Sequence, residues 1–293
     1  MARGLREFMQ MRHSRPEICA GLLAGTIVLG CLIAAAKAPV RADTETEAVS
    51  CVAPEKLVHL QLPLKRTTRQ LASGKLTIIV ALGSSSTAGV GASSPEAAYP
   101  SRLMVDLGLR FPTKPLMVLN RGVSGARAVD MVASLDESVA ADHPDLVLWQ
   151  LGTNAVLRGY EHARSDAVIR EGIKKIRALG ADAVLIDPQY APKVIEHPQI
   201  EDMIGLISSA AAEEKVDVFQ RFALMRYWHE RAGMPFEAFL SPDGLHMNDW
   251  AHSCLATALA DAIAKVAAPD SAHGNESSRL DNAAGESTVG ERR

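Results

Sequence analysis

The sequence predicts an α/β fold in which a five-stranded parallel sheet lies between two layers of helices. Five short apolar runs recur between residues 75 and 220. Segments whose apolar residues repeat with helical periodicity separate these runs. The runs are apolar throughout instead of alternating with polar residues, which is typical of strands covered on both faces. These three observations together predict a parallel sheet with helices on each side.

The order of the elements refines this prediction. We expect strands at residues 75–82, 115–120, 145–151, 182–187 and 216–220, and helices at 96–111, 126–140, 166–179, 200–214 and 248–266. Right-handed crossovers between parallel strands then predict a flavodoxin-like, doubly wound three-layer α/β/α sandwich with strand order 2-1-3-4-5. A single domain over 74–268 accounts for the pattern. Residues 43–73 are interpreted as an N-terminal lead-in lying over it, and 269–293, which have little to bury, as a disordered tail.

The first 42 residues have the composition of a secretory signal. Four arginines precede an uncharged apolar run from Ile18 to Ala36, and "VRA" at 40–42 is a small-residue cleavage pattern of the A-x-A kind. We expect export to the periplasm or the medium. Because the apolar run is just long enough to span a bilayer, an uncleaved anchor formed by residues 18–36 is the alternative.

Charge and cysteine content restrict the environment and the partners. The formal net charge is −3, and removing the six basic and two acidic residues of segment 1–42 makes it −7. An acidic body excludes the basic surface that nucleic-acid binding requires. Only Cys51 and Cys254 remain outside the apolar N-terminal segment. They either pair in an oxidising compartment or stay as separate thiols. The sequence does not indicate an oligomeric state.

The first strand ends in an unusual loop, "GSSSTAG" at residues 83–89. Ligands of doubly wound sheets bind beyond the carboxyl ends of the strands, so such a loop is a candidate site. A phosphate cradle, an ordinary turn and a nucleophile loop are all compatible with small polar residues. The loop lacks the Lys-Ser/Thr ending of a P-loop and the third glycine of a dinucleotide-binding motif.

The ends of the other strands favour the nucleophile. "SPDGLHMN" at 241–248 places Asp243 three residues before His246, a spacing that lets the carboxylate orient the imidazole of a general base. "NRGVSG" supplies the backbone N–H of Gly122, and "GTN" supplies the side-chain amide of Asn154. Hydrogen-bond donors of this kind stabilise the oxyanion in acyl transfer.

These four segments together resemble the SGNH/GDSL hydrolase superfamily, whose invariant Ser, Gly, Asn and His lie in four blocks in this order. The blocks span residues 83–248, nearly the whole predicted domain. The resemblance implies a serine esterase in which Ser85, Asp243 and His246 form the catalytic triad. It also implies an oxyanion hole formed by the backbone N–H groups of Ser85 and Gly122 and the side chain of Asn154, with no cofactor and no metal ion.

Two positions depart from the family pattern. Ser84 stands where the family usually has an acid, and Ala155 follows Asn154 where an aspartate is common. We expect both positions to support their loops without taking part in the chemistry. The chain has no G-x-S-x-G elbow, which argues against a classical α/β-hydrolase.

The predicted function is therefore the hydrolysis of small-molecule or glycan-linked carboxylic esters. The absence of an inserted lid in the predicted domain favours short acyl groups such as acetyl. Tyr190, in the loop after the fourth strand, is a candidate substrate contact. Two alternatives stay open: a flavodoxin-like module that binds phosphate or flavin, and a catalytically degenerate hydrolase that only binds glycans or acyl groups.

Overall fold

The computed structural model describes Cys51 and residues 53–268, so the predicted signal or anchor and the predicted tail lie outside the described residues. Five parallel strands form one sheet in the order β2-β1-β3-β4-β5, as the sequence predicts. The strands are β1 (Thr77–Gly83), β2 (Leu116–Gly122), β3 (Leu146–Gln150), β4 (Asp182–Ile186) and β5 (Asp217–Phe219). The predicted α/β/α fold is confirmed.

Burial of the strands explains their apolar sequences. Every residue of β3 is buried, and β1 and β4 have one partly exposed residue each. The edge strand β2 is more exposed, and the other edge, β5, has only three residues. Because all strands run in the same direction, the residues that follow β1, β2 and β3 meet at the carboxyl end of the sheet. The register places Gly83 directly beside Gly122 at this end.

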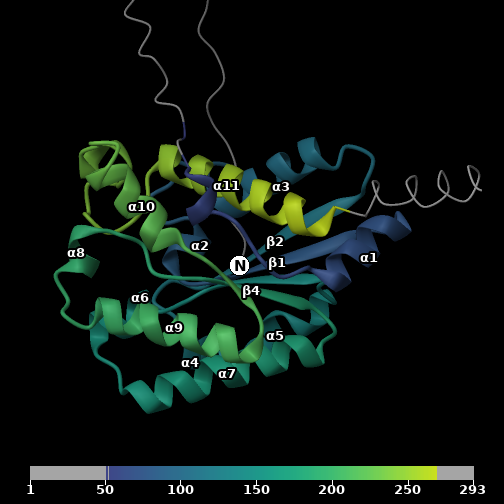
Figure 1. The fold of residues 1–293 in the computed structure, drawn as a ribbon, viewed down its shortest axis with the longest axis horizontal. Helices are drawn as coiled ribbons and strands as arrows, with labels where there is room; N and C mark the ends of the chain where they lie inside the picture. Colours follow the sequence, from purple (N-terminus) through teal and green to yellow (C-terminus); the bar gives the residue numbers. More distant parts are fainter. Residues whose placement is uncertain (1–50, 52, 269–293) are drawn as a thin grey trace, which may run out of the picture. The chain divides into compact units, whose positions relative to one another are not determined.

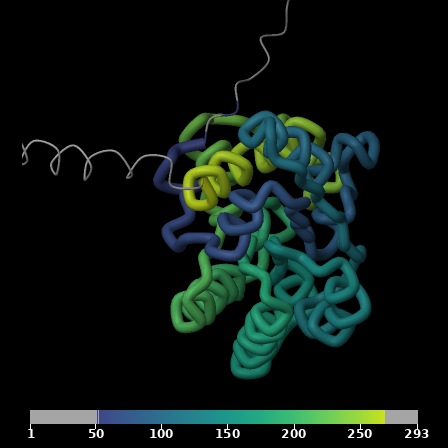
Figure 2. The backbone as a smooth tube through the Cα atoms, turned by 90° about the vertical axis from the view of Figure 1, so that its right-hand side faces the viewer, coloured from purple at the N-terminus to yellow at the C-terminus, as the bar shows by residue number. Residues whose placement is uncertain are grey.

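Two groups of helices cover the two faces of the sheet (Figure 1). The helices α1 (Lys65–Ser73), α3 (Tyr99–Arg110) and α11 (Asp249–Ala267) lie on one face, and α4 (Ala128–Ala133), α7 (His162–Ala178) and α9 (Ile200–Glu214) lie on the other. The rotated view in Figure 2 shows the same separation, with α7 and α9 below and α3 and α11 above. The remaining helical segments are α2 (Ser85–Ala88), α5 (Leu135–Ser138), α6 (Thr153–Arg158), α8 (Pro192–Ile195), α10 (Arg221–Glu230), η1 (Glu55–Leu57), η2 (Ala140–Asp142) and η3 (Phe236–Ala238).

One expected helix is interrupted. The segment predicted as a single helix over 126–140 forms α4, α5 and η2 in succession. The break lies at Ser134, whose ψ is 4° and whose hydroxyl donates to the carbonyl oxygen of Asp130, four residues earlier. Serine hydroxyls that bond to the preceding turn in this way weaken and bend helices.

Part of the predicted lead-in is helical. In α1 the side chains of Thr67 and Leu71 are buried, and the helix packs against α11 and the sheet. The carboxylate of Asp182 binds the N-terminal turn of α1, where it accepts hydrogen bonds from the backbone N–H and the hydroxyl of Thr67. Negative charge at a helix N-terminus is stabilising. The segment was expected only as a lead-in because Leu71 and Ala72 are the only apolar residues of α1.

The described part of the chain also contains a disulfide between Cys51 and Cys254, whose Cα atoms are 5.4 Å apart. Of the two alternatives for these cysteines, the structure has the paired one. The bond ties the segment before α1 to α11. Within the residues that the structure describes, none of the helices has both the length and the apolar character needed to cross a bilayer.

Candidate active site

The side chain of Ser85 is set apart from those of its two serine neighbours. It occupies the first position of α2, directly after β1, and it is partly exposed, whereas Ser84 and Ser86 are only 2% and 1% exposed. The first N–H groups of a helix have no partner within the helix, so the N–H of Ser85 is not used inside α2. Burial therefore distinguishes the three serines where their sequence alone does not.

His246 and Asp243 approach Ser85 from a loop 161 residues further along the chain. The Nε2 atom of His246 is 2.8 Å from Oγ of Ser85, and its Nδ1 atom is 2.5 Å from Oδ2 of Asp243. An ionised carboxylate only accepts hydrogen bonds, so Nδ1 carries the proton and Nε2 is left to accept the proton of the serine hydroxyl. The three side chains thus have the geometry of a nucleophile, its base and the group that orients the base.

Hydrogen bonds hold Asp243 in its ionised form. Burial alone would raise the pKa of this carboxyl group. The His246 side chain, the backbone N–H groups of His246 and Leu245, and the hydroxyl of Ser241 all donate to it, and together they lower its pKa well below the ordinary value. The carboxylate is consequently charged and fixed in direction at neutral pH.

Glycine at position 91 allows the nucleophile loop to approach the histidine. A Cβ atom at Gly91 would overlap the carbonyl oxygen of Met247 and lie 2.9 Å from Cβ of His246. The φ of Gly91 is +94°, a conformation that other residues rarely adopt. The glycines of the loop therefore have a steric role that composition alone did not reveal.

Ser84, which replaces the usual acid, binds a buried glutamine at the end of β3. Its backbone N–H and its hydroxyl both donate to Oε1 of Gln150, at 2.8 and 3.0 Å. Thr87 donates to the same oxygen at 3.2 Å and also lies 3.1 Å from the hydroxyl of Tyr99. The predicted loop-supporting role of Ser84 agrees with these contacts. Gln150 was not among the residues predicted for the site, because its only signal in the sequence is that a polar residue ends an apolar run.

Gly122 and Asn154, the other two predicted oxyanion donors, already donate hydrogen bonds within the protein. The Gly122 N–H donates to Oδ1 of Asn120 at 2.9 Å, and a Cβ atom at this position would overlap the backbone of α2. The amide of Asn154 donates to the carbonyl oxygen of Ala126 at 3.0 Å. Gly125, between these segments, has a φ of +81°, and its N–H has no hydrogen-bond partner among the described residues.

Tyr190 has partners within the protein. Its hydroxyl donates to Glu230 at 2.9 Å, and its ring packs edge-on against Phe222 and stacks with Phe236. Burial, together with the nearby Glu230 carboxylate, raises the pKa of its hydroxyl. The substrate contact expected for Tyr190 stays a prediction, and a substrate would have to meet the exposed part of this side chain.

His252, in α11, holds the start of α3, the helix that follows the nucleophile segment. It is fully buried, its Nδ1 accepts the backbone N–H of Tyr99 at 3.2 Å, and its ring lies parallel to that of Tyr99. Burial lowers the pKa of His252 to about 4. The imidazole is therefore neutral at physiological pH and acts as a fixed structural group.

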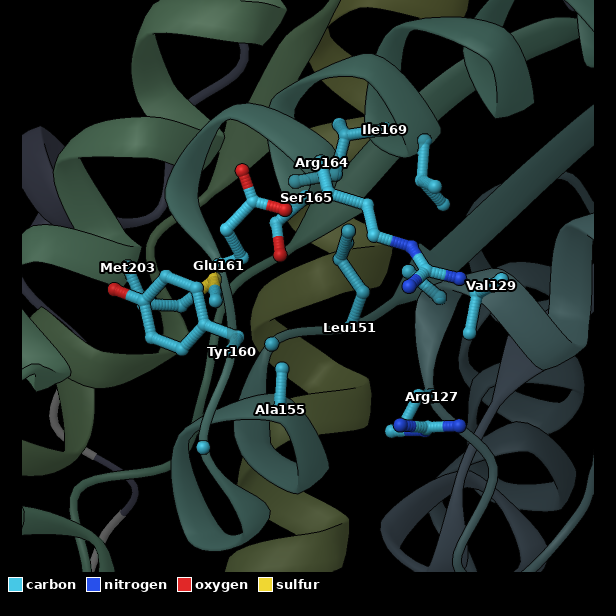
Figure 3. Close-up of a pocket in the computed structure, with 14 residues that line it drawn as sticks. Arg127, Val129, Leu151, Ala155, Tyr160, Glu161, Arg164, Ser165, Ile169 and Met203 are labelled. Carbon is cyan, nitrogen blue, oxygen red and sulfur yellow. The ribbon is translucent and has the colours of Figure 1, made fainter.

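A pocket of about 290 Å³ adjoins the first turn of α6, which carries Asn154. Gly152 and Ala155, on either side of Asn154, contribute to its wall. Figure 3 shows the guanidinium groups of Arg127 and Arg164 on one side of the pocket. Its further lining is Ala128, Val129, Leu151, Gly159, Tyr160, Glu161, Ser165, Val168, Ile169 and Met203. An apolar base with a few charged groups at the rim is typical of small-molecule sites.

Known proteins resemble this chain in sequence and in fold. Esterase TesA of Pseudomonas aeruginosa is 26% identical over 181 residues, which cover 60% of this chain and 82% of TesA. An acetylxylan esterase of Geobacillus stearothermophilus is 28% identical over 175 residues, covering 56% and 74% of the two chains.

Solved structures show the same fold. The crystal structure of TesA superimposes with a TM-score of 0.55 at 24% identity and covers 65% of this chain and 99% of that one. The structure of a two-domain esterase active on acetylated mannans gives a TM-score of 0.58 at 20% sequence identity. The match covers 71% of this chain but only 53% of that protein. Residues 50–269 match the Non-GDSL lipase-like family. The chain therefore belongs to the Non-GDSL lipase-like family, and with its esterase relatives this makes it a carboxylic ester hydrolase of the SGNH/GDSL-like kind.

Proposed function

We propose that this chain cleaves carboxylic esters through an acyl-enzyme formed on Ser85. The observation that carries the proposal is the chain of two short contacts, Ser85 Oγ to His246 Nε2 at 2.8 Å and His246 Nδ1 to Asp243 Oδ2 at 2.5 Å. Serine is a weak nucleophile unless a base removes its proton, and the base acts only when held in the correct orientation.

The proposed reaction has two steps. In the first, Ser85 Oγ attacks the ester carbonyl carbon while His246 Nε2 takes the hydroxyl proton. His246 then gives this proton to the leaving alcohol, and the acyl group stays bound to Ser85. In the second step water attacks the acyl-enzyme, His246 accepts a proton from that water, and the carboxylic acid is released as the proton returns to Ser85. Asp243 stays ionised and stabilises the imidazolium that forms in each step.

The oxyanion needs donors beside Ser85. We assign the backbone N–H of Ser85 and the side-chain amide of Asn154 to this role, as expected from the family. Gly122 remains the predicted third donor, but its N–H is bound to Asn120, which would have to release it. Gly125 is the alternative, since its N–H has no such partner and the next residue, Ala126, contacts Asn154.

For the substrate we propose small-molecule or glycan-linked esters with short acyl groups. The relatives named above include an acetylxylan esterase and an esterase active on acetylated mannans, which supports acetyl esters. The pocket beside α6 is lined by Arg127, Arg164 and Glu161 but not by Ser85 or His246, so the preference for short acyl groups does not rest on it.

We further propose that the enzyme acts outside the cytoplasm, after export directed by residues 1–42. The disulfide between Cys51 and Cys254 supports this proposal, because such bonds persist in oxidising compartments. An anchor formed by residues 18–36 is the alternative, and it would keep the catalytic domain at the membrane surface.

Hydrolysis of p-nitrophenyl acetate by the full chain tests the reaction. We expect turnover, labelling of the protein by a fluorophosphonate, and loss of both in Ser85→Ala. Ser86→Ala is the matched control and should retain both. Asn154→Ala should lower kcat by about 10²–10³-fold without unfolding the protein, the effect typical of one lost oxyanion donor. Turnover by Ser85→Ala, or no turnover by the wild type on any ester, would contradict the proposal, and the latter result would leave a binding module.

A series of esters with increasing acyl length tests the substrate. We expect kcat/KM to be highest for acetyl and to fall as the chain lengthens, and we expect acetylated xylan or mannan to release acetate. A preference for long acyl groups would contradict this part of the proposal while leaving the catalytic residues unaffected.

A further inference from the structure

A buried hydrogen-bond network links the first turn of α6, which carries Asn154, with the loop that carries His246. Its central residue is Gln189, which is 1% exposed and lies three residues beyond β4. Its Oε1 accepts the hydroxyl of Thr153 at 2.8 Å, and Thr153 directly precedes Asn154. Its Nε2 donates to the carbonyl oxygen of Leu245 at 3.3 Å, and Leu245 directly precedes His246. One side chain therefore contacts both segments.

Arg221 fixes the orientation of the Gln189 amide. Its Nη2 donates to Oε1 of Gln189 at 3.0 Å, and its Nε donates to the carbonyl oxygen of Asp187 at 3.0 Å. A guanidinium has donors only, so the glutamine must turn its oxygen toward Arg221 and its NH₂ group toward Leu245. If the amide flipped, its NH₂ group would face the Arg221 guanidinium, and two donors would oppose each other. The orientation of the Gln189 amide is therefore fixed, with its oxygen toward Arg221 and its NH₂ group toward Leu245.

Packing alone does not account for Arg221. The side chain is fully buried, and its Nη1 has no hydrogen-bond partner within the described residues. Burial lowers the pKa of Arg221 to about 10, so the group stays charged at neutral pH. A buried cation with one unsatisfied donor costs stability, and such costs are more common at functional sites than in ordinary cores.

We propose that Gln189 is a positioning residue that sets the first turn of α6, with Asn154, and the loop of His246 relative to each other, with Arg221 holding its amide in one orientation. The proposal rests on the roles proposed above for Asn154 and His246. Displacement of a catalytic group by about 1 Å can lower the rate by about 10²-fold, so a network that fixes these two segments has a direct effect on turnover.

The two contacts of Gln189 can be broken separately. Thr153→Val keeps the shape of the side chain and removes only the contact to the first turn of α6. Gln189→Glu keeps the contacts to Arg221 and Thr153 but places an oxygen against the Leu245 carbonyl oxygen, and so affects the His246 loop. Matched controls away from the site are Thr77→Val, at the N-terminal end of β1, and Gln70→Glu, in α1. Thr77 is buried with an unpaired hydroxyl, and Gln70 donates to the carbonyl oxygen of Leu76.

Kinetics test the contact to Asn154. We expect Thr153→Val to lower kcat by about 10–100-fold with KM changed less than about twofold, and to add nothing to the loss already caused by Asn154→Ala. Thr77→Val and Gln70→Glu should keep wild-type kcat. Wild-type kcat in Thr153→Val, or a full additional loss in the double variant, would overturn the proposal.

A spectroscopic readout tests the contact to His246 independently of activity. The proton on His246 Nδ1, bonded to Asp243, should give a downfield NMR resonance. We expect Gln189→Glu to broaden or shift this resonance and Thr153→Val to leave it unchanged. An unchanged resonance in Gln189→Glu would overturn the proposal even if the wild type failed to hydrolyse any ester. Wild-type inactivity alone would contradict only the proposed function.

Discussion

The hydrogen bonds between Ser84 and Gln150 predict an unequal response to removing either partner. Gln150 Oε1 accepts three donors: the N–H and the hydroxyl of Ser84, and the hydroxyl of Thr87. In Ser84→Ala one donor disappears, and the oxygen keeps two others. In Gln150→Met, which conserves volume, the acceptor disappears, and the N–H and the hydroxyl of buried Ser84 are left unpaired, while Thr87 keeps Tyr99 as a partner.

The expected magnitudes follow from this count. Loss of one satisfied hydrogen bond costs about 0.5–1.5 kcal/mol, so Ser84→Ala should lower the free energy of unfolding by about that amount. Each buried donor left unpaired costs about 1–3 kcal/mol, so Gln150→Met should cost about 2–6 kcal/mol. In the Gln150→Met background, adding Ser84→Ala removes an unpaired hydroxyl. There it should be neutral or stabilising, the reverse of its effect in the wild type.

Urea unfolding of the four proteins, with the disulfide intact, measures these differences. Ester hydrolysis at low urea shows whether loosening the residue before Ser85 also lowers kcat, which we expect for Gln150→Met. The reasoning is refuted if Ser84→Ala and Gln150→Met are equally destabilising, or if Ser84→Ala destabilises both backgrounds by the same amount.

Two further predictions concern the supports of the site. The pKa of His252 is lowered to about 4 in the folded protein, against about 6.5 when unfolded, so the unfolded chain takes up the proton first as the pH falls. The contribution of neutral His252 to stability should be complete above about pH 6.5 and decline toward pH 4. The unfolding free energies at pH 7 and pH 4.5 should therefore differ less in His252→Asn than in the wild type. An equal difference in the two proteins would contradict the lowered pKa of His252. Replacing both Cys51 and Cys254 by alanine should cost about 2–5 kcal/mol. Thermal unfolding with and without reductant checks this, because reductant should lower the Tm of the wild type and leave that of the double variant unchanged.

The architecture could be predicted from the sequence because the central strands β1, β3 and β4 are buried on both faces, which leaves a strong signal. Five uninterrupted apolar runs separated by helical segments allow few arrangements, and the strand order followed from the handedness of the crossovers. The short helices α1 and α10 gave no such signal. The helix expected at 126–140 was wrong in its continuity: the segment breaks at Ser134, whose hydroxyl bonds to the preceding turn, and again at Val139.

Some residues of the candidate site could be predicted from the sequence, and others could not. Asp243 and His246 stand three residues apart, so local spacing was enough to suggest their contact. Gln150, Gln189 and Arg221 were not found, because each acts through partners more than 30 residues away in the chain. A buried polar residue just beyond an apolar run, as at Gln150 and Gln189, is the one signal that pointed to them.

Glycine explains how a loop so rich in small residues positions a single serine. A Cβ atom at Gly122 would overlap the backbone of α2 at Thr87 and Ala88, and one at Gly91 would overlap the carbonyl oxygen of Met247, next to His246. The segment that carries Ser85 thus lies between β2 on one side and the His246 loop on the other. The approach on each side is so close that the residue at the contact, Gly122 or Gly91, must be a glycine. A residue at position 122 larger than glycine would displace α2 and with it Ser85, whether or not the Gly122 N–H contacts the oxyanion. The requirement for glycine here is consequently steric first, and an oxyanion role for its N–H needs separate support.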